Sequence, residues 1–319
     1  MNKNLIPILA IIVPCYNEQA VLSETIQKLK TIIDQLIKQN KINKNSFTLF
    51  VDDGSQDQTW QMINNFHQQN PHIKGIKLSR NFGHQNALLC GLLMVKDTID
   101  CAITIDADLQ DDISLLPQFI EQFQAGHEVV YGVRKQRATD TSFKKNTALA
   151  FYKIMQWLGA KTIADHAEYR LMSQRALNEL ANFKEQNLFL RGIFPALGFK
   201  STYLYYDRQP RLAGDNKYTL KKMFNFACTG ITSSSTFPLR LISILGGSAL
   251  LFTVIASIYF FLTALFSEEK MSHWVTMTLS LYFIGSIQLL SLGIIGEYIA
   301  NIYQESKGRP RFIIEDETK

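Results

Sequence analysis

Two short acidic clusters hold the residue types in this chain that could do chemistry together. Asp52 and Asp53 follow one apolar run, and Asp106 and Asp108 follow another. Each run reads as a buried strand, so each cluster lies where a strand ends and a loop begins. Open α/β sheets bind ligands at those carboxyl ends. Two carboxylates about 4 Å apart repel by about 4 kcal/mol at an effective dielectric near 20, so these clusters need a cation or a hydroxyl-rich ligand.

The spacing of Asp106 and Asp108 predicts a divalent-cation site. Side chains separated by one residue point to the same side of an extended strand, so the two carboxylates could hold one ion together with diphosphate oxygens. Hard oxygen ligands and an incomplete protein cage favour Mg²⁺ or Mn²⁺ over Zn²⁺. The carboxylates of Asp52 and Asp53 suit the imide N–H of uracil and ribose hydroxyls, whereas Asp57 is better placed to begin the next helix.

Alternating strand and helix patterns must position these clusters. Strands are expected at 8–13, 47–51, 73–78, 102–105 and 128–131, with helices at 18–37, 59–69, 86–95 and 114–123. Such alternation predicts βαβ units, and therefore an α/β fold with a mostly parallel sheet and helices on both faces. Neither a Gly-x-Gly-x-x-Gly nor a Walker pattern occurs, which argues against dinucleotide oxidoreductases and P-loop enzymes.

Two uncharged segments near the C-terminus predict transmembrane helices. Residues 241–266 and 274–296 exceed the roughly 20 residues that cross a bilayer. Basic residues flank the pair, so the positive-inside rule places the catalytic domain and both termini in the cytoplasm of a multi-pass protein of the cell membrane. The expected domains are a catalytic domain at 1–218, an interfacial helix at 219–240, membrane helices at 241–266 and 274–303, and a tail at 304–319.

Composition narrows the class of partner. The net charge of +5 over 319 residues is too small to imply nucleic acid, and much of the excess lies just before the first apolar segment. That position favours an anionic membrane surface, although a solvated basic loop is the alternative. The four cysteines show no metal-binding spacing, which fits a reduced compartment. No signal peptide is expected, because the apolar run near the N-terminus is interrupted by Pro7, is too short to span a bilayer and reads as a core strand.

Together these motifs resemble family 2 glycosyltransferases with the GT-A fold. The closer likeness is to polyprenyl-phosphate glycosyltransferases, meaning dolichyl-phosphate mannose synthases and bacterial undecaprenyl-phosphate sugar transferases. The matching pieces run in order along nearly the whole chain, at 14–18, 52–57, 79–85, 106–111, 131–134, 169–172, 190–192 and 214–218. The chain departs from that pattern at Asp112, where relatives have Pro, at Glu168-Tyr169 before Arg170, and at Asn216.

The resemblance implies a role for each matching position. The nucleotide pocket would be lined by Pro14, Tyr16, Glu18, Asp52, Asp53, Arg80 and Asp106. The metal would be held by Asp106 and Asp108, with Gln110. The lipid phosphate or the leaving diphosphate would be bound by Arg134, Arg137, Arg208, Arg211 and Lys217, because the arginine fork matches phosphate oxygens. Contact of these basic residues with lipid headgroups is an equal alternative.

The resemblance also places a catalytic base at Asp165 or Glu168. A phosphate monoester is already anionic near neutrality, with a second pKa of about 6. The base could therefore be nearly dispensable, or could serve to orient the acceptor.

The expected function is inverting transfer of a hexose or N-acetylhexosamine from a nucleotide diphosphate sugar, UDP-linked by preference, to undecaprenyl phosphate. Similar proteins form homo-oligomers, which is compatible with this chain. Two alternatives stay open. A processive polysaccharide synthase would carry a Gln-x-x-Arg-Trp element, but no Trp here follows an Arg. A non-catalytic membrane scaffold would have no need of intact Asp106 and Asp108.

Overall fold

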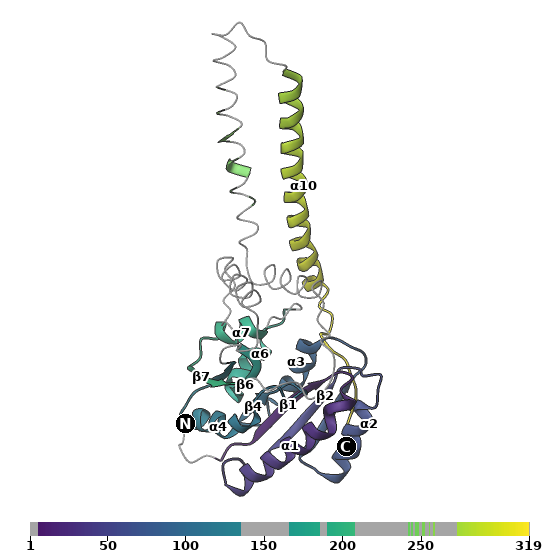
Figure 1. The fold of residues 1–319 in the computed structure, drawn as a ribbon, viewed down its shortest axis with the longest axis vertical. Coiled ribbons are helices and arrows are strands. Elements are labelled where there is room, and N and C mark those ends of the chain that lie inside the picture. The colour runs from purple at the N-terminus through teal and green to yellow at the C-terminus, as the bar shows by residue number, and fades with distance from the viewer. Residues whose placement is uncertain are drawn as a thin grey trace.

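A single eight-stranded sheet forms the centre of the α/β domain of the protein (Figure 1). The structure is a computed structural model that describes residues 6–134, 166–185, 190–207 and 273–318, and isolated positions between 242 and 258. The strand order is β7-β5-β6-β4-β1-β2-β3-β8. The strands are β1 (Leu9–Cys15), β2 (Phe47–Asp52), β3 (Ile73–Leu78), β4 (Cys101–Thr104), β5 (Val129–Arg134), β6 (His166–Ser173), β7 (Ser201–Tyr206) and β8 (Ile314–Glu317).

The expected α/β fold is confirmed. Strands β1, β2, β3 and β4 pair in parallel, as does β5 with β7, whereas β6 runs antiparallel to both β4 and β5. The nine elements expected up to residue 134 all appear close to their predicted limits, because buried strands and amphipathic helices carry strong periodic patterns. Strands β6, β7 and β8 were not predicted.

Helices cover both faces of the sheet, so the core has two layers. One apolar cluster joins the sheet to α1 (Gln19–Lys38), α2 (Thr59–Gln69) and α4 (Leu116–Gln124). The second joins the opposite face to α3 (His84–Val95), α6 (Gln174–Ala181) and α7 (Leu190–Ala196). A short 3-10 helix, η1 (Ile113–Leu115), leads into α4, and Asp112 caps it by accepting from Ser114 N at 2.9 Å, as its position predicts. Burial on both faces explains why the central strands β1 and β4 are almost uniformly apolar.

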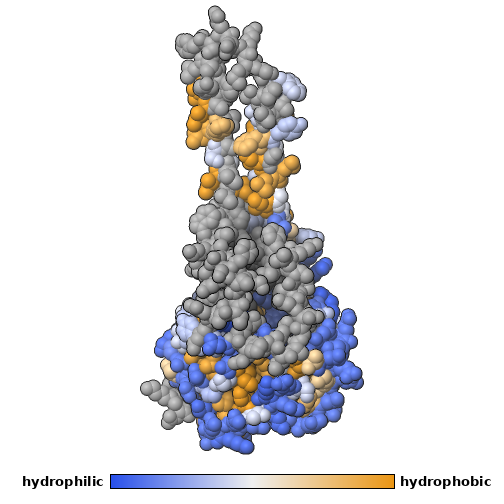
Figure 2. Space-filling model, in the orientation of Figure 1, coloured by the Kyte–Doolittle hydropathy of each residue, from blue (hydrophilic) through white to orange (hydrophobic). Residues whose placement is uncertain are grey.

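A long helix, α10 (His273–Ser306), projects away from this domain (Figure 1). Its side chains are largely apolar and exposed, as Figure 2 shows along the stalk; Trp274, for example, is 77% exposed. Within it, 280–306 is long and apolar enough to cross a membrane, with a mean hydropathy of 1.5. This is the only such helix among the described residues, so the expected pair of spans is not confirmed. Segment 241–266 lies mostly outside the described residues, and segment 219–240 lies wholly outside them.

The chain returns from α10 to the sheet of the α/β domain. Strand β8 pairs antiparallel with β3 and forms the outer edge of the sheet. The tail expected at 304–319 therefore contributes a strand to the same sheet that begins at the N-terminus. No pattern in four residues of mixed polarity distinguishes such a strand from a solvated tail.

Candidate active site

Parallel pairing brings the two acidic clusters to one edge of the sheet. Cys15 lies opposite Asp52 in the β1–β2 register, and Ile12 lies opposite Thr104 in the β1–β4 register. Beyond the strands, Asp53 N still donates to Cys15 O at 2.8 Å. The loops that follow β1, β2 and β4 therefore start side by side, because the carboxyl ends of parallel strands point the same way. The predicted position of both acidic clusters, at the carboxyl ends of neighbouring strands, is confirmed.

Asp53 fastens the loop that follows β3. Its two carboxylate oxygens accept hydrogen bonds from the backbone N–H groups of Phe82, at 2.7 Å, and Gly83, at 2.9 Å. Its side chain is buried, and burial raises the pKa of Asp53 while the two N–H donors oppose that rise. A carboxylate used in this way organises the pocket rather than facing a ligand with both oxygens.

Gly54 allows the same loop to approach closely. Its φ of +67° is accessible to glycine at little cost, and a Cβ at this position would overlap the backbone of Arg80 and Asn81. The backbone of Arg80 therefore lies directly against the turn that follows Asp52 and Asp53, and the Arg80 guanidinium lies 4.0 Å from the ring centre of Phe82. This places the predicted nucleotide-pocket arginine beside Asp53.

Asp52 keeps one carboxylate oxygen without a hydrogen-bond partner among the described residues. One oxygen accepts from Ser55 N at 3.2 Å, while the other is buried and has no hydrogen-bond partner among the described residues. Burial raises the pKa of Asp52. Buried hydrogen-bond acceptors almost always have a partner in folded proteins, so an acceptor oxygen without one at this edge is compatible with a ligand that supplies a hydrogen-bond donor.

The loops that follow β1 and β2 are joined by hydrogen bonds next to Asp52 and Asp53. Asn17 N donates to Ser55 Oγ at 2.9 Å, and Glu18 N donates to Thr59 Oγ1 at 3.0 Å. Asp57 accepts from Thr59 N at 3.0 Å, which confirms its expected place at the start of α2. Tyr16 and Glu18, predicted from the resemblance to face the nucleotide, are thus held on a loop that is bonded to the loop following Asp52 and Asp53.

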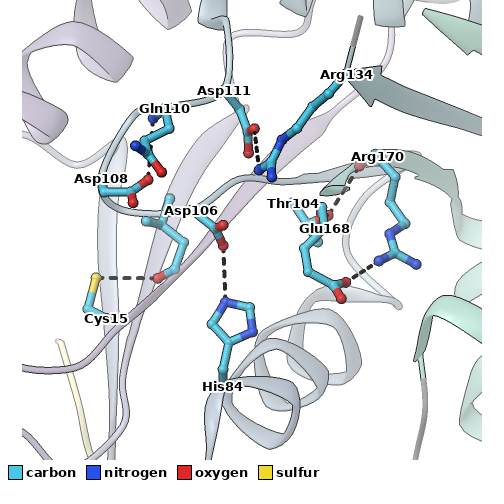
Figure 3. A network of polar contacts seen from close by, with 11 residues as sticks. Cys15, His84, Thr104, Asp106, Asp108, Gln110, Asp111, Arg134, Glu168 and Arg170 are labelled. Atoms are coloured by element: carbon cyan, nitrogen blue, oxygen red, sulfur yellow. Dashed lines mark hydrogen bonds and ion pairs between the residues drawn. The ribbon is translucent and has the colours of Figure 1, made fainter. Parts of the chain in front are cut away.

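Asp106 and Asp108 lie in a turn. The expectation that they continue an extended strand is wrong, because β4 ends at Thr104 and the backbone reverses at Leu109, whose φ is +49°. Asp108 accepts from Gln110 N at 3.3 Å, so the turn closes on itself. Asp106 points instead toward α3, where its carboxylate lies 3.0 Å from His84 Nε2 (Figure 3).

These residues suit a divalent ion only with help from a ligand. The donor set of Asp106, Asp108 and Gln110 consists of hard oxygens, as Mg²⁺ and Mn²⁺ require. Among the described residues no cluster of three or more His, Cys, Asp or Glu side chains could hold a metal by itself. An ion bound here would therefore complete its shell with water and ligand oxygens.

Arg134 makes a buried ion pair that was not predicted. Its Nη2 lies 3.0 Å from Asp111 Oδ1, and the same oxygen accepts from the hydroxyl of Tyr206 (Figure 3 shows the ion pair). Burial is the main reason that the pKa of Asp111 is raised; the nearby charge of Asp106 adds to it, and Arg134 opposes it. The Arg134 side chain is only a quarter exposed, and the carboxylate of Asp111 already balances part of its charge.

Glu168 is also paired. It lies inside β6 and forms an ion pair with Arg170 (Figure 3). The Arg170 side chain is fully buried and lies over the ring of Phe194. Asp165, Arg137, Arg208, Arg211 and Lys217 lie outside the described residues, so their predicted roles stay predictions. Sequence reasoning missed His84 and Tyr206 as neighbours of the site; the motif around 79–85 named the first without a role, and nothing in the sequence marks the second.

A mostly parallel sheet with acidic loops at the carboxyl ends of its strands is typical of ligand-binding α/β proteins. Comparison with known proteins identifies the family. Residues 10–181 match the family model for glycosyl transferase family 2. The uncharacterized glycosyltransferase YkoT of Bacillus subtilis (strain 168) is 48% identical over 97% of this chain and 91% of its own length. The bactoprenol glucosyl transferase of Shigella phage SfV is 33% identical over 97% of this chain and 98% of its own.

The chain belongs to glycosyl transferase family 2, and its catalytic domain has a GT-A-like α/β fold. Among solved structures, the mannosyltransferase PcManGT of Pyrobaculum calidifontis, crystallised with GDP-Man and Mn²⁺, is 15% identical. It covers 91% of this chain and 88% of its own at a TM-score of 0.45. A likeness this distant adds no functional argument. The protein is therefore an enzyme of glycosyl transfer from a nucleotide sugar.

Proposed function

We propose that the protein transfers a hexose, with inversion, from a UDP-sugar to a polyprenyl phosphate at the cytoplasmic face of the membrane. The observation that carries this proposal is the meeting of two acidic clusters at one sheet edge, where Asp52 keeps a buried oxygen without a partner among the described residues. The names of its phage relatives support a bactoprenol acceptor and make glucose the first sugar to test.

On the donor side, Asp52 would accept from the nucleoside, on a surface completed by Pro14, Tyr16 and Glu18. Asp53 and Gly54 would hold Arg80 in place beside it. Asp106 and Asp108, with Gln110, would hold Mg²⁺ or Mn²⁺, which when bound offsets the negative charge of the donor diphosphate. These assignments place the donor along the carboxyl ends of β1, β2 and β4.

In the transfer itself, an oxygen of the lipid phosphate would form the new bond to the anomeric carbon as the bond to the donor diphosphate breaks. The diphosphate leaves with the bonding electrons, and attack from the opposite face inverts the anomeric centre. Arg134, Arg137, Arg208, Arg211 and Lys217 are the proposed phosphate-binding residues. Because Glu168 is already paired with the buried Arg170, Asp165 is the better candidate to orient the acceptor.

Sheet pairing supports two membrane crossings. Strands β3 and β8 belong to one sheet, so the chain must be on the same side of the membrane before 207 and after 314. If α10 crosses the bilayer, the chain must cross a second time between 208 and 272, and the uncharged segment 241–266 is long enough to do so. Lys307, which lies 4.0 Å from the ring centre of Tyr303, would anchor the cytoplasmic end of α10.

A panel of labelled nucleotide sugars tests the proposal. Purified full-length protein in lipid nanodiscs is given undecaprenyl phosphate and each donor in turn, with Mg²⁺ or Mn²⁺. Transfer of label from one UDP-hexose into butanol-extractable lipid, abolished by chelator and restored by added metal, is the expected result. Full activity after chelation would refute the metal assignment. Labelled polymer instead of labelled lipid would refute the acceptor.

A further inference from the structure

The C-terminal tail packs against the strand that feeds the nucleotide loop. Strand β8 pairs with β3, and Thr318 at its end exchanges two hydrogen bonds with Gly75: Gly75 N donates to Thr318 Oγ1 at 2.9 Å, and Thr318 N donates to Gly75 O at 3.0 Å. A Cβ at Gly75 would lie 2.5 Å from a methyl group of Ile63 in α2 and 3.0 Å from the methyl group of Thr318. Both α2 and the tail therefore pack closely against β3 at this point.

The contact closest to the pocket is a backbone hydrogen bond. Ser79 N donates to Ile313 O at 3.0 Å, one residue before Arg80. On the other side of the tail, Arg311 donates to the carbonyl of Phe183 at 2.9 Å. The tail thus bridges from β3 to the segment after α6, and it fixes the residue at which β3 ends and the loop begins.

The loop is consequently held at both ends. Ile313 of the tail binds Ser79 at its start, and Asp53 binds Phe82 and Gly83 at its end. Arg80 and Asn81 lie between these fixed points, against Gly54. A loop held by hydrogen bonds at one end only would sample more conformations, and a bound nucleotide sugar would have to order it at a cost in binding free energy.

We propose that strand β8 is a positioning element for the nucleotide-sugar pocket, which it controls by holding Ser79 and hence Arg80. The inference rests on the proposed function, because it assumes that Arg80 lies against the donor. Only residues 307–312 separate the end of α10 from Ile313, so the same tail links the apolar helix to the pocket.

A pair of matched variants separates the backbone of the tail from its side chains. Glu315 and Asp316 are exposed, and successive N–H groups of an edge strand point alternately toward and away from its neighbour. The double variant Glu315→Pro/Asp316→Pro therefore removes one pairing N–H whichever way the strand faces. The control Glu315→Ala/Asp316→Ala removes the same side chains, including the partner of Lys77, and keeps both N–H groups.

The measurements are the KM for the UDP-sugar, the KM for the lipid acceptor, kcat, and the dissociation constant of UDP, all with full-length protein in nanodiscs. The proline variant is expected to raise the donor KM and the UDP dissociation constant by about fivefold or more, the effect of losing roughly one net hydrogen bond. The acceptor KM should stay unchanged, and the alanine control should match the wild type. A lower kcat with an unchanged donor KM would mean that the tail is only structural, and would overturn the inference.

A second measurement needs no variant. Binding free energies are reciprocal, so UDP must slow amide exchange in the tail if the tail improves UDP binding. Protection of residues 313–318 by saturating UDP is expected, and unchanged exchange there would refute the inference even if the proline variant fails to fold. Wild-type protein that binds no UDP at all would instead refute the proposed function.

Discussion

Replacing Asp53 by Asn tests how the acidic edge organises the pocket. The carboxylate of Asp53 accepts from two backbone N–H groups, those of Phe82 and Gly83, at 2.7 and 2.9 Å. An Asn side chain has the same shape but only one accepting oxygen, so its NH₂ group must face one of these N–H donors. The substitution therefore keeps the volume of the side chain and breaks one end of the loop attachment.

The expected effect follows from hydrogen bonding to a charged acceptor, which contributes about 1.5–3 kcal/mol for each bond. The substituted side chain would lose one bond entirely and weaken the other, while the raised pKa of Asp53 indicates that burial of its charge offsets part of that gain. A net loss of about 2 kcal/mol results, which is roughly a 30-fold rise in the population of the open loop.

Amide hydrogen exchange of Phe82 and Gly83 measures that population directly, and the KM for the donor reports its consequence. Exchange should accelerate about 30-fold and the donor KM should rise, whereas the acceptor KM should not change. Asp97→Asn is the matched control, since Asp97 is exposed and pairs with the neighbouring Lys96. If Asp53→Asn left both the exchange rates and the donor KM unaltered, Asp53 would not be holding this loop.

Three further predictions concern the other carboxylates. Burial raises the pKa of Asp52 above its unfolded value, so the stability contributed by its protonated form is fully present below the unfolded pKa and is lost as pH rises through the folded pKa. The melting temperature of Asp52→Asn relative to wild type should therefore increase with pH. A flat difference between about pH 3 and 8 would contradict this. Asp106→Asn should lower kcat/KM more than Asp165→Asn at saturating metal, and the reverse order would count against a metal-holding Asp106. Arg134→Met should destabilise the fold by about 3 kcal/mol by leaving Asp111 buried without its cation, and unfolding should show part of that loss recovered in Arg134→Met/Asp111→Asn.

Much of the catalytic domain could be predicted because its signals are local. Strands β1, β2 and β4 are largely apolar runs, and helices such as α1 repeat apolar residues at helical spacing. Parallel order then follows from βαβ connections, and it places Asp52 and Asp106 at one edge. The role of Asp57 at the start of α2 was predictable for the same reason, since helix caps depend on neighbouring residues.

What could not be predicted depends on contacts between distant residues. Glu168 is a base candidate by its place in the sequence, but Arg170 and the buried environment of β6 decide that it is paired. The turn at 106–109 was mistaken for a strand, because a positive φ at Leu109 has no sequence signal of the kind that glycine gives.

By itself the sequence determined the chemistry available to this protein: paired carboxylates after apolar strands, arginines for phosphate and a long uncharged helix. The tertiary structure alone decided which of these groups already have hydrogen-bond or ion-pair partners within the protein. Asp53 is engaged by backbone N–H groups, whereas Asp52 keeps an oxygen without a partner among the described residues, and β8 returns from the far end of the chain to support the loop at Ser79. The physical reason is that a side chain's type fixes what it can bind, but competition among all buried donors and acceptors fixes what it does bind.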